Sequence, residues 1–286
     1  MAAPMLYDVA LSITQSYGSP AVGARQVVRL VPPTLPGEQE VIVSSLSADP
    51  IPDERRDRRD FFGNGVVEIA VTARVRRLVS PPQLQLSPDI AGLATEIAKV
   101  RSVGPDAPHH FRSASPRVPH VPALAAYARK SVTITGSALE CVETLGLALY
   151  RDMKFDPEAT TVATPVAEAF EARHGVCQDF SHIMIGCLRS LGIPAGYVSG
   201  FLRTIPPEGK PRLQGADAMH AWVCAWCGFE LGWVEYDPTN AVFANTDHII
   251  IARGRDYGDV APVKGVLRTA GMQDADHAVD MVEVPA

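Results

Sequence analysis

The sequence predicts an α+β fold in which an N-terminal antiparallel β-sandwich is followed by helices and then by an antiparallel sheet. Three observations support this prediction. Apolar and polar side chains alternate through about the first 85 residues, which is the period of half-buried strands. Residues 123–153 are rich in helix formers, residues 177–191 carry apolar side chains at helical spacing, and strand patterning returns after residue 196. Helices followed by strands are typical of an α+β unit.

The expected N-terminal strands are short and lie between turn sequences. The clearest covers residues 7–14, where the larger apolar side chains fall on every second position. Further strands are expected over residues 26–31, 40–46, 66–75 and 84–86. Turns such as Pro36-Gly37 and Pro81-Pro82 separate them. Short strands with frequent turns indicate an antiparallel sandwich.

The second unit is expected to begin with helices. They are predicted over residues 123–130, 138–153, from 165 onward, and most clearly over 177–191. The last of these has six apolar residues on one face: Phe180, Ile183, Met184, Cys187, Leu188 and Leu191. Strands are then expected over residues 196–203, 219–226, 231–236, 248–252 and near 279–284.

The length of 286 residues suggests two domains, at a typical size of roughly 150 residues each. We place the sandwich in residues 1–88 and the second unit in residues 89–286, with its chemical motifs in about 160–260. Neither internal repeats nor low-complexity segments are apparent in the sequence.

Composition narrows the class of protein. The chain has 26 Lys and Arg against 32 Asp and Glu, a net charge of −6, which argues against a nucleic-acid partner. Its five cysteines are an odd number without the density of a secreted disulfide scaffold, so reduced thiols are expected. The N-terminus lacks the basic and apolar regions of a signal peptide, and no apolar run approaches the roughly 20 residues of a membrane span. We therefore expect a cytoplasmic protein without a membrane partner.

One cysteine stands where a nucleophile would be placed. In Gly175-Val176-Cys177-Gln178, a glycine-containing turn leads into the amphipathic helix, so Cys177 is expected at its N-terminus. The positive end of the helix dipole stabilises a thiolate there. Cys187 lies on the apolar face of the same helix and is predicted to belong to the core.

A thiolate nucleophile works best beside a histidine that an acceptor orients. His220 lies 43 residues beyond Cys177 in a strand-like segment, and Asp237 ends another strand 17 residues further on. Neighbouring antiparallel strands could bring these two side chains together, facing the helix that carries Cys177. Taken singly, each of these residue types is more often structural.

Four sequence blocks resemble the bacterial transglutaminase-like cysteine enzymes, whose core is papain-like. The blocks are GVCQDFSHIMIGCLRSLGIPAGYVSGFL, DAMHAWV, GWVEYDPTN and HIIIARGRDYGDVAPVKGV. The segments YDVALSITQSYGSP, QVVRLVPP and DFFGN are similar to the β-rich domain that precedes this core in the family. The resemblance therefore covers nearly the whole chain.

The resemblance implies a triad of Cys177 as nucleophile, His220 as general base and acid, and Asp237 as the residue that orients the imidazole. The expected reaction is acyl transfer on a peptide or protein substrate through a thioester, without a cofactor. Hydrolysis is favoured, because water is always available and nothing in the sequence indicates an amine site. The alternatives are a protein-glutamine amine acyltransferase and a non-catalytic binding module of the same fold.

Three neighbours, Trp222, Asp179 and Gln178, are candidates for the wall of the site. Asp179 could instead complement the helix dipole, which we favour, and Trp222 could merely pack. The backbone N–H of Cys177 is a natural oxyanion donor, and a second donor is not assigned. His182 lies on the opposite side of the helix and is interpreted as structural.

No metal site is predicted. His109, His110 and His120 lack a spacing that would aim them at one ion, and Cys224 and Cys227 lack a second ligand pair. No EF-hand-type acidic loop indicates calcium.

Two positions depart from the family pattern. Gly196 stands where an arginine is usual, and Ala241 where a glycine is common. Both leave the triad intact and bear on loop shape and substrate contacts.

Overall fold

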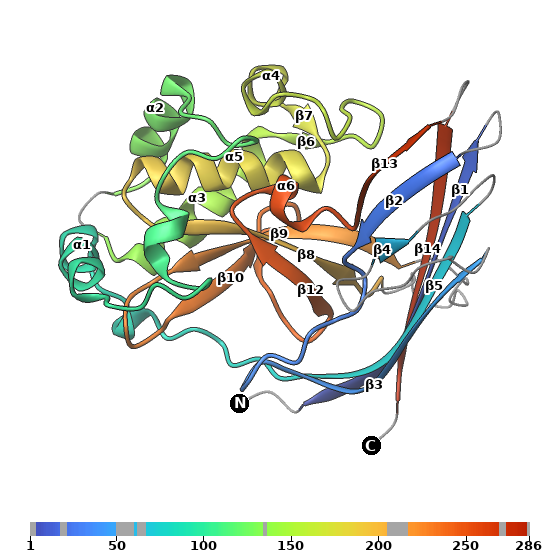
Figure 1. Cartoon of the computed structure of the whole chain (residues 1–286). Coiled ribbons are helices and arrows are strands. Elements are labelled where there is room, and N and C mark those ends of the chain that lie inside the picture. Colours follow the sequence, from blue (N-terminus) through green and yellow to red (C-terminus); the bar gives the residue numbers. More distant parts are fainter. Residues whose placement is uncertain are drawn as a thin grey trace, which may run out of the picture.

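The computed structural model describes residues 4–17, 22–49, 60–61, 67–133, 136–204, 217–268 and 273–284. It confirms the predicted α+β class: a β-rich unit lies beside a unit of helices packed on a five-stranded antiparallel sheet (Figure 1). None of the helices in these residues combines the length and apolar character that crossing a bilayer requires.

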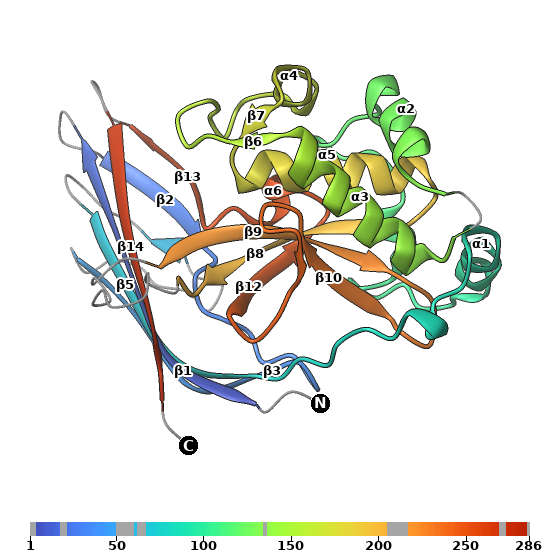
Figure 2. The ribbon, with the colours of Figure 1, turned by 180° about the vertical axis from the view of Figure 1, so that it is seen from behind.

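The β-rich unit consists of two antiparallel sheets. The larger has the strand order β14-β1-β5-β3 and the smaller β13-β2-β4, and both views show them side by side (Figures 1 and 2). The strands are β1 (Met5–Tyr17), β2 (Val22–Val28), β3 (Gln39–Asp49), β4 (Asp60–Phe61), β5 (Val67–Arg77), β13 (Val263–Arg268) and β14 (Gln273–Glu283). Their alternating side chains bury a common core that includes Tyr7, Val9, Leu11 and Val75.

Strands from both ends of the chain build this unit. β14 pairs antiparallel with β1 over eleven residue pairs, from Tyr7 opposite Glu283 to Tyr17 opposite Gln273. β13 likewise pairs with β2. The division into residues 1–88 and 89–286 stays a prediction, and the pairing shows that both ranges contribute strands to each sheet of the β-rich unit.

The connection between the units is helical where a strand was expected. Residues Leu84–Leu86 form the 3-10 helix η1, so the predicted strand over 84–86 is wrong. The run lies between Pro81-Pro82 and Pro88, and the N–H groups of Leu86 and Ser87 donate to the carbonyls of Gln83 and Leu84. Helix α1 (Ile90–Lys99) was not predicted; Asp89 caps it by accepting from the N–H of Gly92 at 2.7 Å.

The remaining helices pack on the five-stranded sheet or on one another. They are η2 (Pro108–Phe111), α2 (Pro122–Ser131), α3 (Ala138–Asp152), α4 (Val166–Ala172), α5 (Cys177–Ser190) and α6 (Tyr257–Val260). The central helix is α5, whose predicted apolar face packs with the sheet residues Ala221, Val223 and Tyr236 in one core.

The five-stranded sheet has the order β11-β10-β9-β8-β12. Its strands are β8 (Ala195–Leu202), β9 (Ala218–Trp226), β10 (Trp233–Asp237), β11 (Val242–Phe243) and β12 (His248–Gly254). A short parallel pair, β6 (Lys154–Phe155) and β7 (His174–Gly175), precedes α5.

The two units share buried side chains. Phe201 of β8 and Ile249 and Ile251 of β12 belong to the same hydrophobic cluster as Tyr7 and Leu11 of β1. The β-rich unit therefore packs against the strand β12 at the edge of the five-stranded sheet.

Candidate active site

Cys177 is the first residue of α5, and hydrogen bonds fix the turn that precedes it. The turn before it is fixed by Asp179, whose Oδ2 accepts from the N–H of Val176 at 2.8 Å and from the hydroxyl of Thr160 at 2.5 Å. The first N–H groups of a helix have no partner within it and give its N-terminus a positive potential. Cys177 therefore lies at the positive end of the α5 dipole.

The other four cysteines are buried in the hydrophobic interior, whereas Cys177 is partly exposed. Burial raises the pKa of the Cys187, Cys224 and Cys227 thiols to about 12 and that of Cys141 to about 11. Cys187 lies in the core, as predicted from its place on the apolar helix face. Cys177 is the thiol that a substrate can reach.

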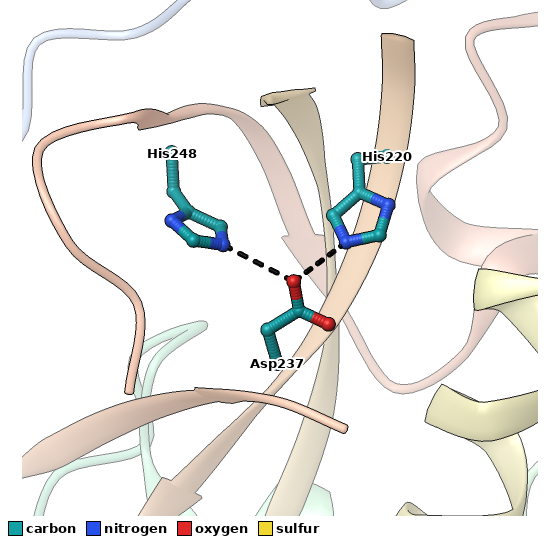
Figure 3. A group of neighbouring side chains, drawn as sticks. All are labelled: His220, Asp237 and His248. Carbon is teal, nitrogen blue, oxygen red and sulfur yellow. Dashed lines mark hydrogen bonds and ion pairs between the residues drawn. The ribbon is translucent and has the colours of Figure 1, made fainter. Parts of the chain in front are cut away.

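His220 lies near the start of β9, next to both Cys177 and Asp237. Its Nε2 donates to Oδ2 of Asp237 at 2.7 Å (Figure 3), and the nearby Cys177 side chain favours the charged form of its ring. Since Nε2 is used by the carboxylate, Nδ1 is the nitrogen left to face the thiol. Burial disfavours the charged ring, but the contacts to Asp237 and Cys177 outweigh it and raise the pKa of His220 to about 10.

Asp237 ends β10 and is fully buried. Pro238 follows it, and the chain turns so that Oδ1 accepts from the N–H groups of Thr239 at 2.9 Å and Asn240 at 3.3 Å. The side-chain amide of Asn240 donates to Oδ2 at 2.7 Å. Burial opposes ionisation, but the hydrogen bonds from the two histidines hold the pKa of this carboxyl well below its usual range.

The second of those histidines, His248, was not identified from the sequence. It is the first residue of β12, and its Nε2 lies 3.3 Å from the Asp237 Oδ2 that also binds His220 (Figure 3). His248 is the first residue of the segment HIIIARGRDYGDVAPVKGV, which resembles the family. β9 and β8 separate β10 from β12 in the sheet, so only the tertiary structure shows that this histidine reaches the carboxylate.

Trp222 packs behind the two imidazoles. Its indole stacks on the His220 ring with the planes inclined by 30° and 6.1 Å between centroids, and it meets the His248 ring edge-on at 5.1 Å. Gly200, paired with His220 on the neighbouring strand, makes room for the indole, because a Cβ there would lie 2.4 Å from the ring. Trp222 is fully buried, so it supports the imidazoles from within the protein.

The structure gives the other two wall candidates supporting contacts. Asp179 caps α5 as described, and burial raises the pKa of its carboxyl. Gln178 is buried, and its amide donates to the carbonyl of Val162 at 3.4 Å. Both side chains hold the segment before Cys177 against the helix.

His182 has a structural environment. Burial lowers its pKa to about 4, and its Nε2 accepts the N–H of Tyr257 at 3.2 Å, which ties α5 to the start of α6. His109 and His110 instead lie near backbone carbonyls: His109 Nε2 is 3.2 Å from the Val100 oxygen, and His110 Nε2 is 3.4 Å from the Val103 oxygen.

The group His220, Asp237 and His248 has atoms of the kind that bind metals, lying within 4.8 Å of one another. Five N–H donors already point at the carboxylate, from both histidines, the Thr239 backbone and two groups of Asn240. The acceptor sites of the carboxylate are therefore occupied by N–H donors. We interpret the group as a hydrogen-bonded cluster and not as a metal site.

The β-rich unit reaches this cluster through Arg77, at the end of β5. Its Nε donates to the backbone carbonyl of His248 at 2.9 Å, and its Nη2 pairs with Glu235 at 3.0 Å. Glu235 also pairs with Arg253, which in turn binds Glu38. A buried ionic network therefore connects β5 and the segment before β3 to the two strands that carry Asp237 and His248.

Comparison with known proteins identifies the family. Residues 124–238 match the transglutaminase-like superfamily, and residues 7–80 match the bacterial transglutaminase-like N-terminal region. A Mycobacterium tuberculosis protein described as uncharacterized is 33% identical over 284 residues, covering 94% of this chain and 88% of the relative. This chain belongs to the transglutaminase-like superfamily.

Two further proteins are similar to this chain. A Mycobacterium leprae protein, also described as uncharacterized, is 40% identical over 134 residues, 46% of each chain. The crystal structure of a candidate cysteine protease from Cytophaga hutchinsonii superimposes with a TM-score of 0.75 at 20% identity, covering 100% of this chain and 92% of that one. The latter likeness supports the fold.

The two departures from the family pattern have local structural consequences. Ala241 has φ of 55°, the left-handed region in which glycine is favoured, so the alanine carries backbone strain directly after the Asp237 turn. Gly196 lies against Phe111, and a Cβ there would come within 2.7 Å of its ring. An arginine at residue 196 would therefore require the segment around Phe111 to move.

Proposed function

We propose that this protein is a cysteine-dependent acyl transferase that hydrolyses a peptide-type amide, with Cys177, His220 and Asp237 as its catalytic triad. The observation that carries this proposal is an imidazole that donates to a buried carboxylate and lies beside a partly exposed thiol at a helix N-terminus. The thiol supplies the nucleophile, the imidazole moves the proton, and the carboxylate orients the imidazole.

In the first step the Cys177 thiolate attacks the amide carbonyl carbon, forming a C–S bond and a tetrahedral oxyanion. The backbone N–H of Cys177, at the start of α5, has no acceptor within the helix and is the natural donor to that oxyanion. The C–N bond then breaks as His220, protonated at Nδ1, gives its proton to the leaving amine. Acyl-enzyme and free amine are the products.

In the second step water replaces the amine. His220 takes a proton from the water, whose oxygen forms the new C–O bond while the C–S bond breaks and the thiolate is regenerated. Asp237 keeps the imidazole in one orientation through both steps, because its Oδ2 accepts from Nε2 at 2.7 Å. The same triad would pass the acyl group to a primary amine, so transamidation remains the alternative outcome.

Alkylation tests whether Cys177 is activated. The wild type should react with iodoacetamide at Cys177 well below the pH at which a free thiol reacts, and the Cys177→Ala variant should lose this labelling. Cys187 and Cys224 are internal controls, because burial raises the pKa of both thiols to about 12. If Cys177 reacts no faster than a free cysteine, the proposal is wrong and a binding role is favoured.

A second experiment distinguishes water from an amine as the acceptor. A library of peptides that includes glutamine peptides is incubated with the enzyme, with and without a primary amine, and the products are identified by mass. Cleaved or deamidated peptide supports hydrolysis, whereas an amine adduct formed in preference to either supports transamidation. The Cys177→Ala variant provides the background for both products.

A further inference from the structure

His248 shares a carboxylate oxygen with the triad histidine. Its ring is buried, with a side-chain exposure of 2%, and its Nε2 lies 3.3 Å from Oδ2 of Asp237. Figure 3 shows both imidazoles pointing their Nε2 atoms at this one oxygen from opposite sides. A carboxylate offers only acceptors, so the His248 nitrogen that faces it carries a hydrogen in either charge state of the ring.

The other side of the His248 ring is also held. Its Nδ1 lies 3.2 Å from the backbone N–H of Asn245 and 3.1 Å from that residue's Oδ1. The Asn245 oxygen is itself fixed, since it accepts from the N–H of Asp247 at 2.8 Å. With Trp222 packed edge-on against it, the imidazole has contacts on both nitrogens and on its face.

The backbone that carries His248 is anchored by the β-rich unit. Arg77, itself buried, donates to the His248 carbonyl at 2.9 Å. The buried amide of Gln39 binds both the N–H and the C=O of Ile250, two residues along β12, at 2.9 Å each. These contacts place the imidazole from outside the sheet that carries Asp237.

We propose that His248 is a positioning residue of the acyl-transfer reaction, donating from Nε2 to Oδ2 of Asp237 and so fixing the carboxylate that orients His220. This inference rests on the proposed function and deepens it. It also assigns a role to the β-rich unit, which holds His248 through Arg77 and Gln39.

The donated hydrogen bond has an electrostatic consequence. Each donor to a carboxylate takes up part of its charge, and His248 is one of five. The charged groups nearby are otherwise paired: Asp247 with Arg203, and Glu235 with Arg77 and Arg253. Without His248, more of the Asp237 charge is available to His220, and the imidazolium should hold its proton to higher pH.

The test compares alkylation of Cys177 by iodoacetate and by iodoacetamide across pH. An imidazolium beside the thiolate attracts the anionic iodoacetate. The rate with iodoacetate divided by the rate with iodoacetamide therefore falls at the pH where His220 loses its proton. We expect His248→Leu to move this pH upward by about half a unit or more, because one donor is lost. His248→Gln, whose amide can donate to Oδ2, should move it back toward the wild-type value.

Controls separate this effect from general damage. His182→Gln removes another buried imidazole, on α5 but without contact to Asp237, and should leave the pH of the fall unchanged. If His248→Leu does not fold, His248→Asn takes its place, because its shorter side chain carries an amide that stops short of the carboxylate. The proposal is overturned if the pH at which the rate ratio falls is unchanged or lower in His248→Leu or His248→Asn. It is also overturned if His248→Gln shows the same pH as His248→Leu.

A wild-type measurement is independent of the variants' folding. In protein labelled with nitrogen-15 in its imidazoles, His248 should show a protonated Nε2, assigned by its disappearance in His248→Gln. An unprotonated Nε2 contradicts the inference. Slow alkylation of Cys177 in the wild type itself would instead reject the proposed function, so the two failures are distinguishable.

Discussion

At the scale of single residues, Asp237 organises the candidate site. A fully buried carboxylate is costly unless its lone pairs are satisfied, and here five N–H donors supply that satisfaction. Two of them are the backbone amides of the turn that Asp237 itself initiates. The aspartate therefore shapes the loop after β10 and orients His220 with the same side chain.

Protonation of His220 should make folding stability depend on pH. Its pKa rises from an unfolded value near 6.5 to about 10, so the folded state binds the extra proton. The stabilisation is fully present below pH 6.5 and is lost as pH rises toward 10. A Cys177→Ser background removes the thiol's own titration. It also removes the thiol's part in raising the His220 pKa, so that the part due to Asp237 remains.

The measurement is the free energy of unfolding in urea at pH 6, 8 and 10 for Cys177→Ser and for Cys177→Ser with His220→Gln. The difference between the two should be largest at pH 6 and shrink at each higher pH. A difference that is constant over this range contradicts the protonation of His220 in the folded protein.

Ala241 offers a stabilising substitution beside the site. Its φ of 55° costs a non-glycine residue roughly 1 kcal/mol, whereas glycine adopts this conformation freely. Ala241→Gly should therefore raise the free energy of unfolding by up to about 1 kcal/mol, reduced by the greater freedom of glycine in the unfolded chain. Urea denaturation measures this, and a loss of stability would show that the strain is relieved by another contact.

At the scale of elements, two helix caps allow an effect on the stability of the fold to be distinguished from an effect on Cys177. α5 and α3 each have a capping side chain at their N-terminus. Asp179, the third residue of α5, accepts from the N–H of Val176 before the helix, and Ser137 accepts from the N–H of Glu140 at 3.2 Å for α3. Losing such a cap costs about 1 kcal/mol in either helix. Only the α5 cap also fixes the turn that presents Cys177.

Asp179→Ala and Ser137→Ala should therefore differ in one measurement and agree in another. Both should lower the melting temperature by a few degrees, as about 1 kcal/mol does for a protein of this size. Asp179→Ala should in addition slow the alkylation of Cys177, because the Val176 turn and Thr160 lose their common partner. Equal alkylation rates in the two variants would show that the cap does not position the thiol.

At the scale of the whole molecule, the two units are joined by apolar packing and by a buried ionic network. Arg77 and Glu235, with side-chain exposures of 3% and 6%, meet across the junction. Removing one partner of a buried pair typically costs 3–5 kcal/mol, since the other charge is left without compensation. Arg253 also pairs with Glu235, which places the expectation for Arg77 at the lower end of about 3–5 kcal/mol.

Arg77→Met tests this junction against a surface control. It should lower the free energy of unfolding by about 3 kcal/mol. Arg74→Met, in the same strand, removes an exposed pair with Asp8 and should cost under about 1 kcal/mol. Urea denaturation of both variants compares them, and similar losses would mean that the junction contributes no more than a surface ion pair.

Local sequence patterns predicted much of the fold. Strand and helix periodicity located the central strands and α5, because alternation and helical spacing depend only on neighbours along the chain. The same reasoning missed η1, where prolines override an alternating run, and α1, whose Asp89 cap was present in the sequence but was not recognised. The apolar positions Leu93 and Ile97 that bury α1 are one turn apart and form a weak pattern.

The sequence by itself predicted most of the order of the strands and helices. It also predicted the candidate residues Cys177, His220 and Asp237, from their local settings and from the family resemblance. Only the tertiary structure decided that His248 shares the Asp237 carboxylate, that Arg77 holds His248 from 171 residues away, and that β14 pairs with β1. The physical reason is that periodicity specifies which face of an element is buried but not what it is buried against. Partners far apart in the chain are selected by packing and by the need to satisfy every buried polar group.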